Sequence, residues 1–202
     1  MHRRAINHLK RSDPVMARLI AAVGPCRFTT HDHIAYFPYL TRAIVYQQLS
    51  TKAAATIFGR FETLCGGTVE PRVVAGLADP KLRAAGLSTQ KTRYVKDLAS
   101  RVASGEVVLE GLEQRGDDEI IATLTQVTGI GRWSVHMFLM FRLGRPDVLP
   151  ELDLGIQKAI RKAYRLRSMP KPERVKAIGA KWSPHATIAS WYLWRSLDSP
   201  NV

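Results

Sequence analysis

Hydrophobic residues recur along the chain at helical spacing, separated by residues that start or stop helices. One example is an apolar stripe on a predicted helix, made of Ile120, Ile121, Leu124 and Val127. The alternation typical of half-buried strands is scarce, whereas Gly-Pro, Gly-Gly and Ser-Pro breakers recur. The pattern predicts an all-α globular protein without an internal repeat, a low-complexity tract or a long linker.

Capping residues indicate where the helices begin. Side-chain oxygens stand at five predicted starts, those of Asp13 (before Pro14), Ser50, Ser88, Asp117 and Asp153. The predicted helices cover roughly residues 14–23, 34–49, 51–65, 79–85, 89–104, 117–127, 132–143 and 153–166, followed by a shorter helix from Pro170 and a last one from Ser183-Pro184 to about Leu197.

The chain is strongly basic. Its 202 residues include 30 Lys and Arg against 17 Asp and Glu, which gives a formal net charge of +13, and the basic residues are spread along the chain. Lys and Arg displace condensed counterions from phosphate chains, so this charge favours a polyanionic partner on a folded surface. The alternative is a soluble protein that is merely basic. Charge alone does not separate DNA from RNA or a membrane.

Cysteine usage and the length of the apolar runs bear on the compartment. Cys26 and Cys65 have neither metal-ligand spacing nor a disulfide framework, and no four-cysteine iron–sulfur signature is present. Arg18 interrupts the apolar stretch after the basic start, so no signal-peptide core follows. The longest apolar run, residues 135–141, is far too short to span a bilayer. We expect a cytoplasmic, nucleoid-associated protein and no membrane partner.

The segment from Leu124 to Ser134 contains a candidate phosphate-binding turn. Gly129 and Gly131 would let the backbone turn tightly between two helices, while Ile130 plugs the core beneath. Without side chains, both glycines would let a phosphate approach the amides that open the second helix. The alternative is an ordinary helix–helix turn. Other candidate phosphate contacts are Arg132, Ser134, Lys52 and Lys91, each of which could instead be a solvated polar group.

Asp153 is the candidate catalytic carboxylate. It stands where a helix should begin, so it could simply be an N-cap. The two roles are compatible, because a capping carboxylate is held rigidly and the helix dipole keeps it ionised. Such a group suits a developing positive charge. The competing carboxylate, Glu151, lies ahead of the cap and is expected to be solvated.

Together these motifs resemble the helix-hairpin-helix DNA glycosylase superfamily. The hairpin is followed about twenty residues later by Pro-x-x-Asp-Leu-Gly, which ends at Gly155. The segment from Ile44 to Ala54 is similar to the substrate-side helix of that family. Trp182-Ser-Pro and Trp191-Tyr-Leu-Trp-Arg195 match its DNA-3-methyladenine glycosylase II branch. The resemblance covers roughly residues 35–196.

The resemblance implies a compact, two-lobed, all-α fold with the active site in the cleft between the lobes. One lobe would be a helical barrel of residues 35–145 that contains the helix-hairpin-helix. The other would combine residues 1–34 with residues 146–202 and carry the catalytic aspartate. The implied partner is double-stranded DNA with a damaged base, bound by a monomer.

The resemblance also implies roles for individual residues. By position Asp153 matches the catalytic aspartate of the family. Gln48 or its neighbour Leu49 matches the wedge residue that fills the gap left by a flipped base. The base pocket would be lined by Trp133, Trp194, Met137 and Tyr46. No cofactor is needed for the chemistry, although the hairpin of this family often holds a monovalent cation. Here a structural Na⁺ or K⁺ would use the backbone of Gln126, Val127 and Ile130.

Trp133 stands where bifunctional relatives carry a nucleophilic lysine, so no Schiff base can form there. Asp153 would instead stabilise the oxocarbenium-like sugar and orient or deprotonate water. The expected reaction is monofunctional excision of alkylated purines, 3-methyladenine and 7-methylguanine, after base flipping. Indole faces at Trp133 and Trp194 would attract such cationic bases. The alternatives are a non-catalytic DNA-binding module and a glycosylase for deaminated or etheno purines.

Overall fold

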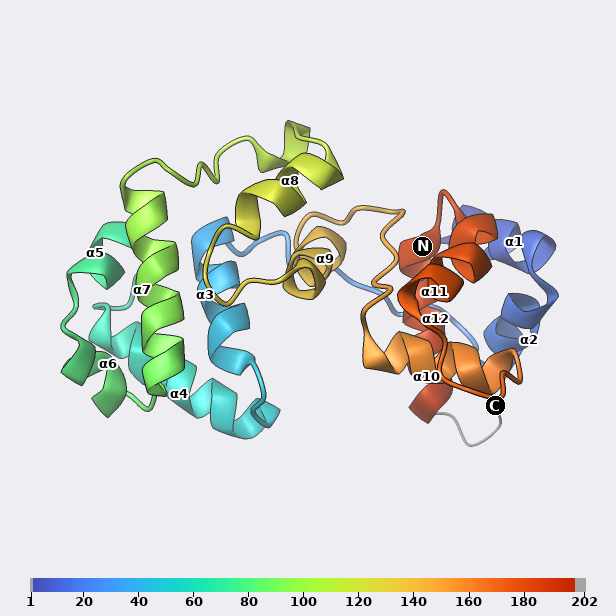
Figure 1. Ribbon diagram of the computed structural model, residues 1–202, viewed down its shortest axis with the longest axis horizontal. Helices are drawn as coiled ribbons and strands as arrows, with labels where there is room; N and C mark the ends of the chain where they lie inside the picture. Colours follow the sequence, from blue (N-terminus) through green and yellow to red (C-terminus); the bar gives the residue numbers. More distant parts are fainter. Residues whose placement is uncertain (1, 199–202) are drawn as a thin grey trace. The chain divides into compact units, whose positions relative to one another are not determined.

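The computed structural model describes residues 2–198, and within that range every regular element is a helix (Figure 1). The all-α prediction is confirmed. The chain forms two compact units, one of which runs His31–Phe138. The other combines the described residues up to Thr30 with those from Leu139 onward. The sequence placed these boundaries a few residues later, at 34–35 and 145–146. No helix in the described range is long and apolar enough to cross a membrane.

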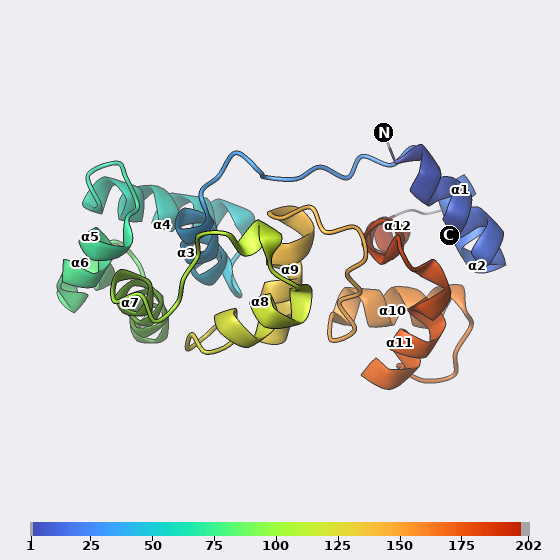
Figure 2. The ribbon, with the colours of Figure 1, turned by 90° about the horizontal axis from the view of Figure 1, so that it is seen from above.

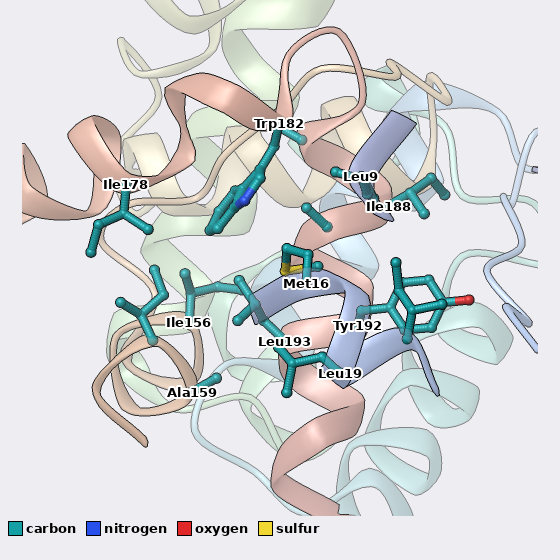
Figure 3. Packing of buried hydrophobic residues seen from close by; sticks show 14 of the residues in the cluster. Leu9, Met16, Leu19, Ile156, Ala159, Ile178, Trp182, Ile188, Tyr192 and Leu193 are labelled. Carbon is teal, nitrogen blue, oxygen red and sulfur yellow. The ribbon is translucent and has the colours of Figure 1, made fainter. Parts of the chain in front are cut away.

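The unit built from the N-terminal and C-terminal segments of the described chain is here called the terminal unit. The helices Arg3–Ser12, Pro14–Val23 and Ala186–Asp198 all contact one another in it. Among its described residues it contains α1 (Arg3–Ser12), α2 (Pro14–Val23), α10 (Leu154–Ala163), α11 (Pro172–Gly179), the 3-10 helix η2 (Ala180–Trp182) and α12 (Ala186–Asp198). Helix α12 contacts α1, α2 and α10. These helices and η2 bury an apolar cluster that includes Leu9, Met16, Trp182, Tyr192 and Leu193 (Figure 3). Burying an aliphatic side chain of this size contributes about 1.5–3 kcal/mol.

The carboxylate of Asp13 is buried against Trp182 of this apolar cluster. It caps α2 by accepting a hydrogen bond from the Val15 amide at 2.9 Å. The same side chain accepts a bond from Trp182 Nε1 at 2.8 Å and another from the hydroxyl of Tyr164, and its Oδ2 lies 3.3 Å from Lys181 Nζ. A buried carboxylate is tolerated only when such partners replace its water. Asp13 thereby ties together segments more than 150 residues apart in the chain.

The second unit, here called the hairpin unit, is organised around its longest helix. In the described chain it contains α3 (Tyr36–Tyr46), α4 (Thr51–Leu64), α5 (Pro71–Gly76), α6 (Asp79–Ala84), α7 (Thr89–Ala103), η1 (Leu112–Gln114), α8 (Asp117–Leu124) and the start of α9 (Arg132–Phe141). Helix α7 contacts α3, α5 and α6, beside which it lies in both views (Figures 1 and 2). It buries Thr92, Val95, Leu98 and Ala99 against them.

Four of the five predicted helix caps are confirmed by side-chain hydrogen bonds. Asp13 accepts from Val15 N, Ser50 from Ala53 N, Ser88 from Lys91 N and Asp153 from Ile156 N. The predicted cap at Asp117 is wrong. Gly116 is the N-cap of α8, and Asp117 is its first residue. There its carboxylate, with those of the next two residues, faces the positive end of the helix dipole.

Other differences from the predicted helices have local causes. Helix α3 ends at Tyr46 rather than near Leu49, since Gln48 adopts a left-handed backbone conformation (φ 56°). The helix expected from Pro170 begins at Pro172, because a residue before proline is held extended. No predicted helix covers α1 or α5, although α5 begins with Pro71, a residue typical of a first helical position. Neither has a side-chain hydrogen bond at its N-cap.

Opposing effects act on the pKa of Asp13. Burial alone would raise the pKa of this carboxyl, but the hydrogen bonds from Tyr164, Trp182 and the Val15 amide and the charge of Lys181 outweigh it, so the pKa is lowered. The ionised form is therefore favoured by folding. Its contribution to stability is present above the carboxyl's unfolded pKa, about 4, and is lost as pH falls through the lower folded value.

We predict that Asp13→Asn destabilises the protein by about 3 kcal/mol at neutral pH, because an amide presents its own N–H groups to donors that now meet a carboxylate. Urea denaturation between pH 7 and pH 3 measures the effect. The difference in the free energy of unfolding from the unmodified protein should shrink below about pH 4. A difference that stays constant over this range would contradict the assignment, as would an equally stable variant.

Candidate active site and nucleic-acid interface

Asp153 lies at the N-terminus of α10 with its carboxylate fixed by the helix. Its Oδ1 accepts a hydrogen bond from the Ile156 amide at 2.8 Å, and its backbone carbonyl begins the helix by accepting from Gln157 N at 3.0 Å. A turn precedes the helix, in which Asp153 N donates to Pro150 O at 2.9 Å. The side chain is half-buried. The same hydrogen bond that starts α10 therefore orients the carboxylate.

A second donor reaches the same oxygen from α12. The indole Nε1 of Trp194 donates to Asp153 Oδ1 at 2.9 Å, and the ring stacks on Phe141 with centroids 6.0 Å apart and planes 26° apart. Two donors on one oxygen fix both the position and the rotation of the carboxylate. Trp194 therefore has a role that the sequence did not predict. Its place in the base pocket stays a prediction, whereas its hydrogen bond to Asp153 is observed.

Gly155 explains how the indole can come so close. A Cβ at this position would lie 2.9 Å from Asp153 Oδ1, 3.0 Å from Trp194 Cδ1 and 3.2 Å from Trp194 Nε1. Real Cβ atoms essentially never show a contact as short as the first, and contacts of 3.0–3.2 Å are unusually tight, so the carboxylate would have to move and the indole to give by a few tenths of an ångström. The glycine of the Asp-Leu-Gly motif is thus needed by the carboxylate two residues before it. In the sequence, Gly155 could be identified only as part of the Pro-x-x-Asp-Leu-Gly motif.

Glu151 was expected to be solvated, and this is wrong. Its side chain is buried, and its Oε1 lies 3.3 Å from Lys176 Nζ on α11. Its backbone carbonyl also accepts a hydrogen bond from Gln157 Nε2 at 3.0 Å. The turn before α10 directs Glu151 toward α11, where a lysine replaces the lost water. Glu151 is therefore a structural carboxylate in the terminal unit.

The turn between α8 and α9 has the two glycines that the sequence singled out, and they have different requirements. Gly129 has a positive φ of 88°, and a Cβ there would lie 2.1 Å from Tyr94 Cδ2. Gly131 is exposed and has no atom within 4 Å of a built Cβ. Ile130 is buried, as expected for a residue that plugs the core. Folding thus requires glycine at 129 only. A side chain at 131 would meet no protein atom and would point into open space.

Asp97 on α7 supports the hairpin through a hydrogen bond. This residue was not among the predicted site residues. Asp97 Oδ2 accepts from the Thr128 amide at 2.7 Å, and its carboxylate also pairs with Arg101 at 3.1 Å. Burial would raise the pKa of Asp97, but the hydrogen bonds from Thr128 and Arg101 and the arginine charge lower it overall. The carboxylate stays ionised at neutral pH. Its spacing from Arg101 was visible in the sequence, but not its bond to the hairpin.

The predicted wedge residues lie in a short loop after α3. Gln48 and Leu49 are both exposed, with 40% of the Leu49 residue surface accessible. The residue before them, Gln47, donates from Nε2 to the carbonyl of Gly129 at 3.0 Å. The structure thus links this loop directly to the hairpin. Gln47 could not be singled out from the sequence, because its partner lies 82 residues away.

Lys91 was expected to contact phosphate, and the structure gives its ammonium another use. Lys91 Nζ donates to the carbonyls of Val45 and Gln47, both at 2.7 Å. Burial lowers the pKa of this half-buried lysine. The other candidate phosphate contacts remain accessible: Lys52 is exposed at the start of α4, and Arg132 and Ser134 are partly exposed in the first turn of α9.

The remaining pocket candidates lie on two helices of the hairpin unit. Trp133, 42% exposed, and the half-buried Met137 are on α9, and Tyr46 ends α3 with the guanidinium of Arg42 4.4 Å from its ring centroid. Asp153 and Trp194 belong to the terminal unit. The structure thus brings Asp153 and Trp194 together in one unit, and the hairpin and the Gln48–Leu49 loop in the other.

Comparisons with known proteins agree with this geometry. Residues 41–185 match the family described as "HhH-GPD superfamily base excision DNA repair protein". The chain is 36% identical to DNA-3-methyladenine glycosylase 1 of Schizosaccharomyces pombe over 94% of its own length and 85% of the relative's. It is 29% identical to the alkylbase DNA glycosidase-like protein mag2 of the same yeast, over 96% and 93% of the two chains.

A solved structure extends the comparison to three dimensions. The S. pombe 3-methyladenine DNA glycosylase Mag1, in complex with abasic DNA, matches with a TM-score of 0.84 and 34% identity over 98% of both chains. The family match, residues 41–185, includes Asp153 and the hairpin. The chain therefore belongs to the HhH-GPD superfamily of base excision DNA repair proteins.

Proposed function

We propose that this protein is a monofunctional DNA glycosylase that removes alkylated purines, 3-methyladenine and 7-methylguanine, by hydrolysing the N-glycosidic bond. The observation that carries the proposal is the Asp153 carboxylate, which two donors hold on a single oxygen at the start of α10. The names of two relatives, an S. pombe DNA-3-methyladenine glycosylase and an alkylbase glycosidase-like protein, support this substrate class. A non-catalytic DNA-binding protein would account for the N-cap bond but gives no reason for the second donor, Trp194, on the same oxygen.

Asp153 acts on the sugar. As the bond to the base lengthens, positive charge develops on the deoxyribose, and a fixed carboxylate stabilises this charge without reorganising. It also orients the attacking water or takes its proton, so that water bonds to the sugar carbon as the base leaves with the electron pair of the broken bond. The base must first leave the duplex, because the glycosidic carbon is inaccessible within the stack.

Trp133 supports hydrolysis without a covalent intermediate. This position would have to hold an amine for a Schiff base to form, and an indole cannot supply one. Its exposed ring suits an alkylated purine, whose positive charge is attracted to an indole face by about 0.5–2 kcal/mol. The same charge weakens the glycosidic bond. The leaving base therefore needs little acid catalysis.

Duplex DNA would be held through its phosphates at the hairpin. The helix dipole places partial positive charge at the start of α9, directly after Gly131, which favours a phosphate there. Lys52, Arg132 and Ser134 are the accessible polar side chains proposed to add to this contact. Gln48 or Leu49 would enter the stack where the damaged base leaves. The protein would bind as a monomer.

A structural Na⁺ or K⁺ at the hairpin remains part of the proposal. It would be held by the backbone carbonyls of Gln126, Val127 and Ile130, oxygen donors that can replace the water of such an ion. The carbonyl of Val127 accepts a hydrogen bond from Ile130 N at 3.0 Å and has a second lone pair. The ion would neutralise part of the phosphate charge. The described residues contain no group of three or more His, Cys, Asp or Glu side chains suited to a metal.

Asp153→Asn should fold and bind DNA but lose most of its excision activity. Asparagine caps a helix about as well as aspartate, whereas losing a preorganised electrostatic group costs about 10²–10³ in rate. Single-turnover assays on duplexes with one 3-methyladenine or 7-methylguanine measure the loss, with alkali revealing abasic sites. Glu173→Gln is the matched control, an exposed carboxylate in the first turn of α11. Near-full excision by folded Asp153→Asn would show that the active site is assigned wrongly.

Gly155→Ala should lower excision by displacing the Asp153 carboxylate or the Trp194 indole, since the new Cβ would lie 2.9–3.2 Å from their atoms. We expect a loss of about tenfold or more, because misplacing a catalytic group by a fraction of an ångström is costly. The assay is single-turnover excision of 7-methylguanine. Gly59→Ala on α4, with nothing within 4 Å of the added Cβ, should remain fully active. Equal activity in both variants would argue against a role for the close packing.

The two hairpin glycines should respond differently to substitution. Gly131→Asp should fold normally, since its Cβ meets no protein atom, but bind duplex DNA at least about tenfold more weakly because a carboxylate would face phosphate. Gly129→Ala should lose stability, since its Cβ would overlap Tyr94 and its φ is positive. Thermal unfolding and DNA binding at several salt concentrations separate the effects. Normal binding by Gly131→Asp, or binding insensitive to salt, would contradict the hairpin assignment.

A further inference from the structure

Helix α7 carries two lysines with matching hydrogen-bond arrangements. Lys91 Nζ donates to the carbonyls of Val45 and Gln47, both at 2.7 Å, where α3 ends. Lys96 Nζ donates to the carbonyls of Ala75 and Leu77, at 2.9 and 2.8 Å, where α5 ends. In both cases one ammonium bridges two carbonyls at a helix C-terminus, where carbonyls lack intrahelical partners.

The segments that the two lysines hold are different. The chain held by Lys96 continues directly into α6, and Lys96 Nζ also lies 3.8 Å from Asp79 Oδ1 in that helix. The chain held by Lys91 continues into Gln48, with its left-handed backbone, and the exposed Leu49. Gln48 is in a conformation that is strained for a residue with a side chain, so it needs support from outside the loop.

The hairpin is held by the same side of α7. Tyr94 packs against Gly129, and Asp97 accepts from the Thr128 amide at 2.7 Å. Residues spaced three apart are neighbours on a helix surface, so Lys91, Tyr94 and Asp97 form one row along α7. Gln47 closes the arrangement by donating to the Gly129 carbonyl at 3.0 Å. One helix thus fixes the loop and the hairpin relative to each other.

We propose that Lys91 is a positioning residue for base flipping, which holds the Gln48–Leu49 loop in register with the phosphate-binding hairpin. The proposal rests on the glycosylase function proposed above. A phosphate bound at the hairpin sets the place of the duplex, and the loop then meets the base stack at a fixed distance from it. Without Lys91 the hairpin still binds phosphate, since Tyr94 and Asp97 hold it, but the loop is no longer aligned.

The test compares Lys91→Met with Lys96→Met. Both lysines lie on α7, and each substitution removes an ammonium that bridges two carbonyls. Both substitutions should therefore lower stability similarly. Undamaged duplex affinity should be close to that of the unmodified protein in both. Single-turnover excision of 7-methylguanine should fall about ten- to a hundredfold in Lys91→Met only. The fluorescence of a 2-aminopurine beside the lesion should report reduced base unstacking in Lys91→Met alone.

A second substrate separates alignment from a general structural defect. A 7-methylguanine in an unpaired bulge has no base pair to break, so flipping it depends less on the loop. The loss of excision in Lys91→Met should therefore shrink to a few-fold on this substrate. An equal defect on paired and bulged substrates would overturn the proposal, as would equal losses of excision in both lysine variants. If Lys91→Met does not fold, Gln47→Leu, which lacks the bond to Gly129, should show the same dependence on the substrate.

The outcome also distinguishes this proposal from the proposed function. If the unmodified protein excises neither alkylated purine, the proposed function fails, whatever the variants do. The positioning role of Lys91 is then decided by the 2-aminopurine signal alone, since unstacking precedes any bond cleavage. A signal reduced in Lys91→Met but not in Lys96→Met supports the role, and equal signals in the two variants refute it.

Discussion

The candidate chemistry of this protein depends on one hydrogen-bonded carboxylate at a helix N-terminus. The bond from the Ile156 amide to Asp153 starts α10 and at the same time fixes the group that would face the developing charge on the sugar. Trp194 completes this arrangement, and Gly155 leaves it room. Helix formation and the proposed catalysis would thus share the same interaction. The entropy of orienting the carboxylate is lost on folding rather than during the reaction.

The hairpin unit uses rigid secondary structure in a comparable way. One row of side chains on α7 supports the hairpin at Gly129 and the loop after α3. The proposed phosphate contacts and base-stack contacts would come from chain segments about eighty residues apart, so their spacing cannot be set by local structure. A helix that touches both segments sets it instead. This arrangement explains why a lysine with candidate phosphate-binding chemistry is used within the protein.

Buried charges show where reasoning from polarity alone reaches its limit. Asp13 and Glu151 are both buried and ionisable, and each is paired with a lysine; the Asp13 carboxylate also accepts hydrogen bonds from Trp182 and Tyr164. A sequence shows a carboxylate before a helix in both cases. Whether its partner is water or another part of the chain depends on which helix packs beside it. For Glu151, the proximity of α11 reversed the expectation of a solvated side chain.

The sequence by itself determined the helical class, four of the five predicted caps, the glycine turn between α8 and α9, and the basic character of the chain. These features depend on interactions within a few residues, or on composition, and both are legible in a linear string. Only the tertiary structure decided the partners of Lys91, Glu151 and Trp194, which lie 25 to 46 residues away. Such contacts arise when helices pack, because a buried polar group must bond to whichever donor or acceptor the packing places beside it.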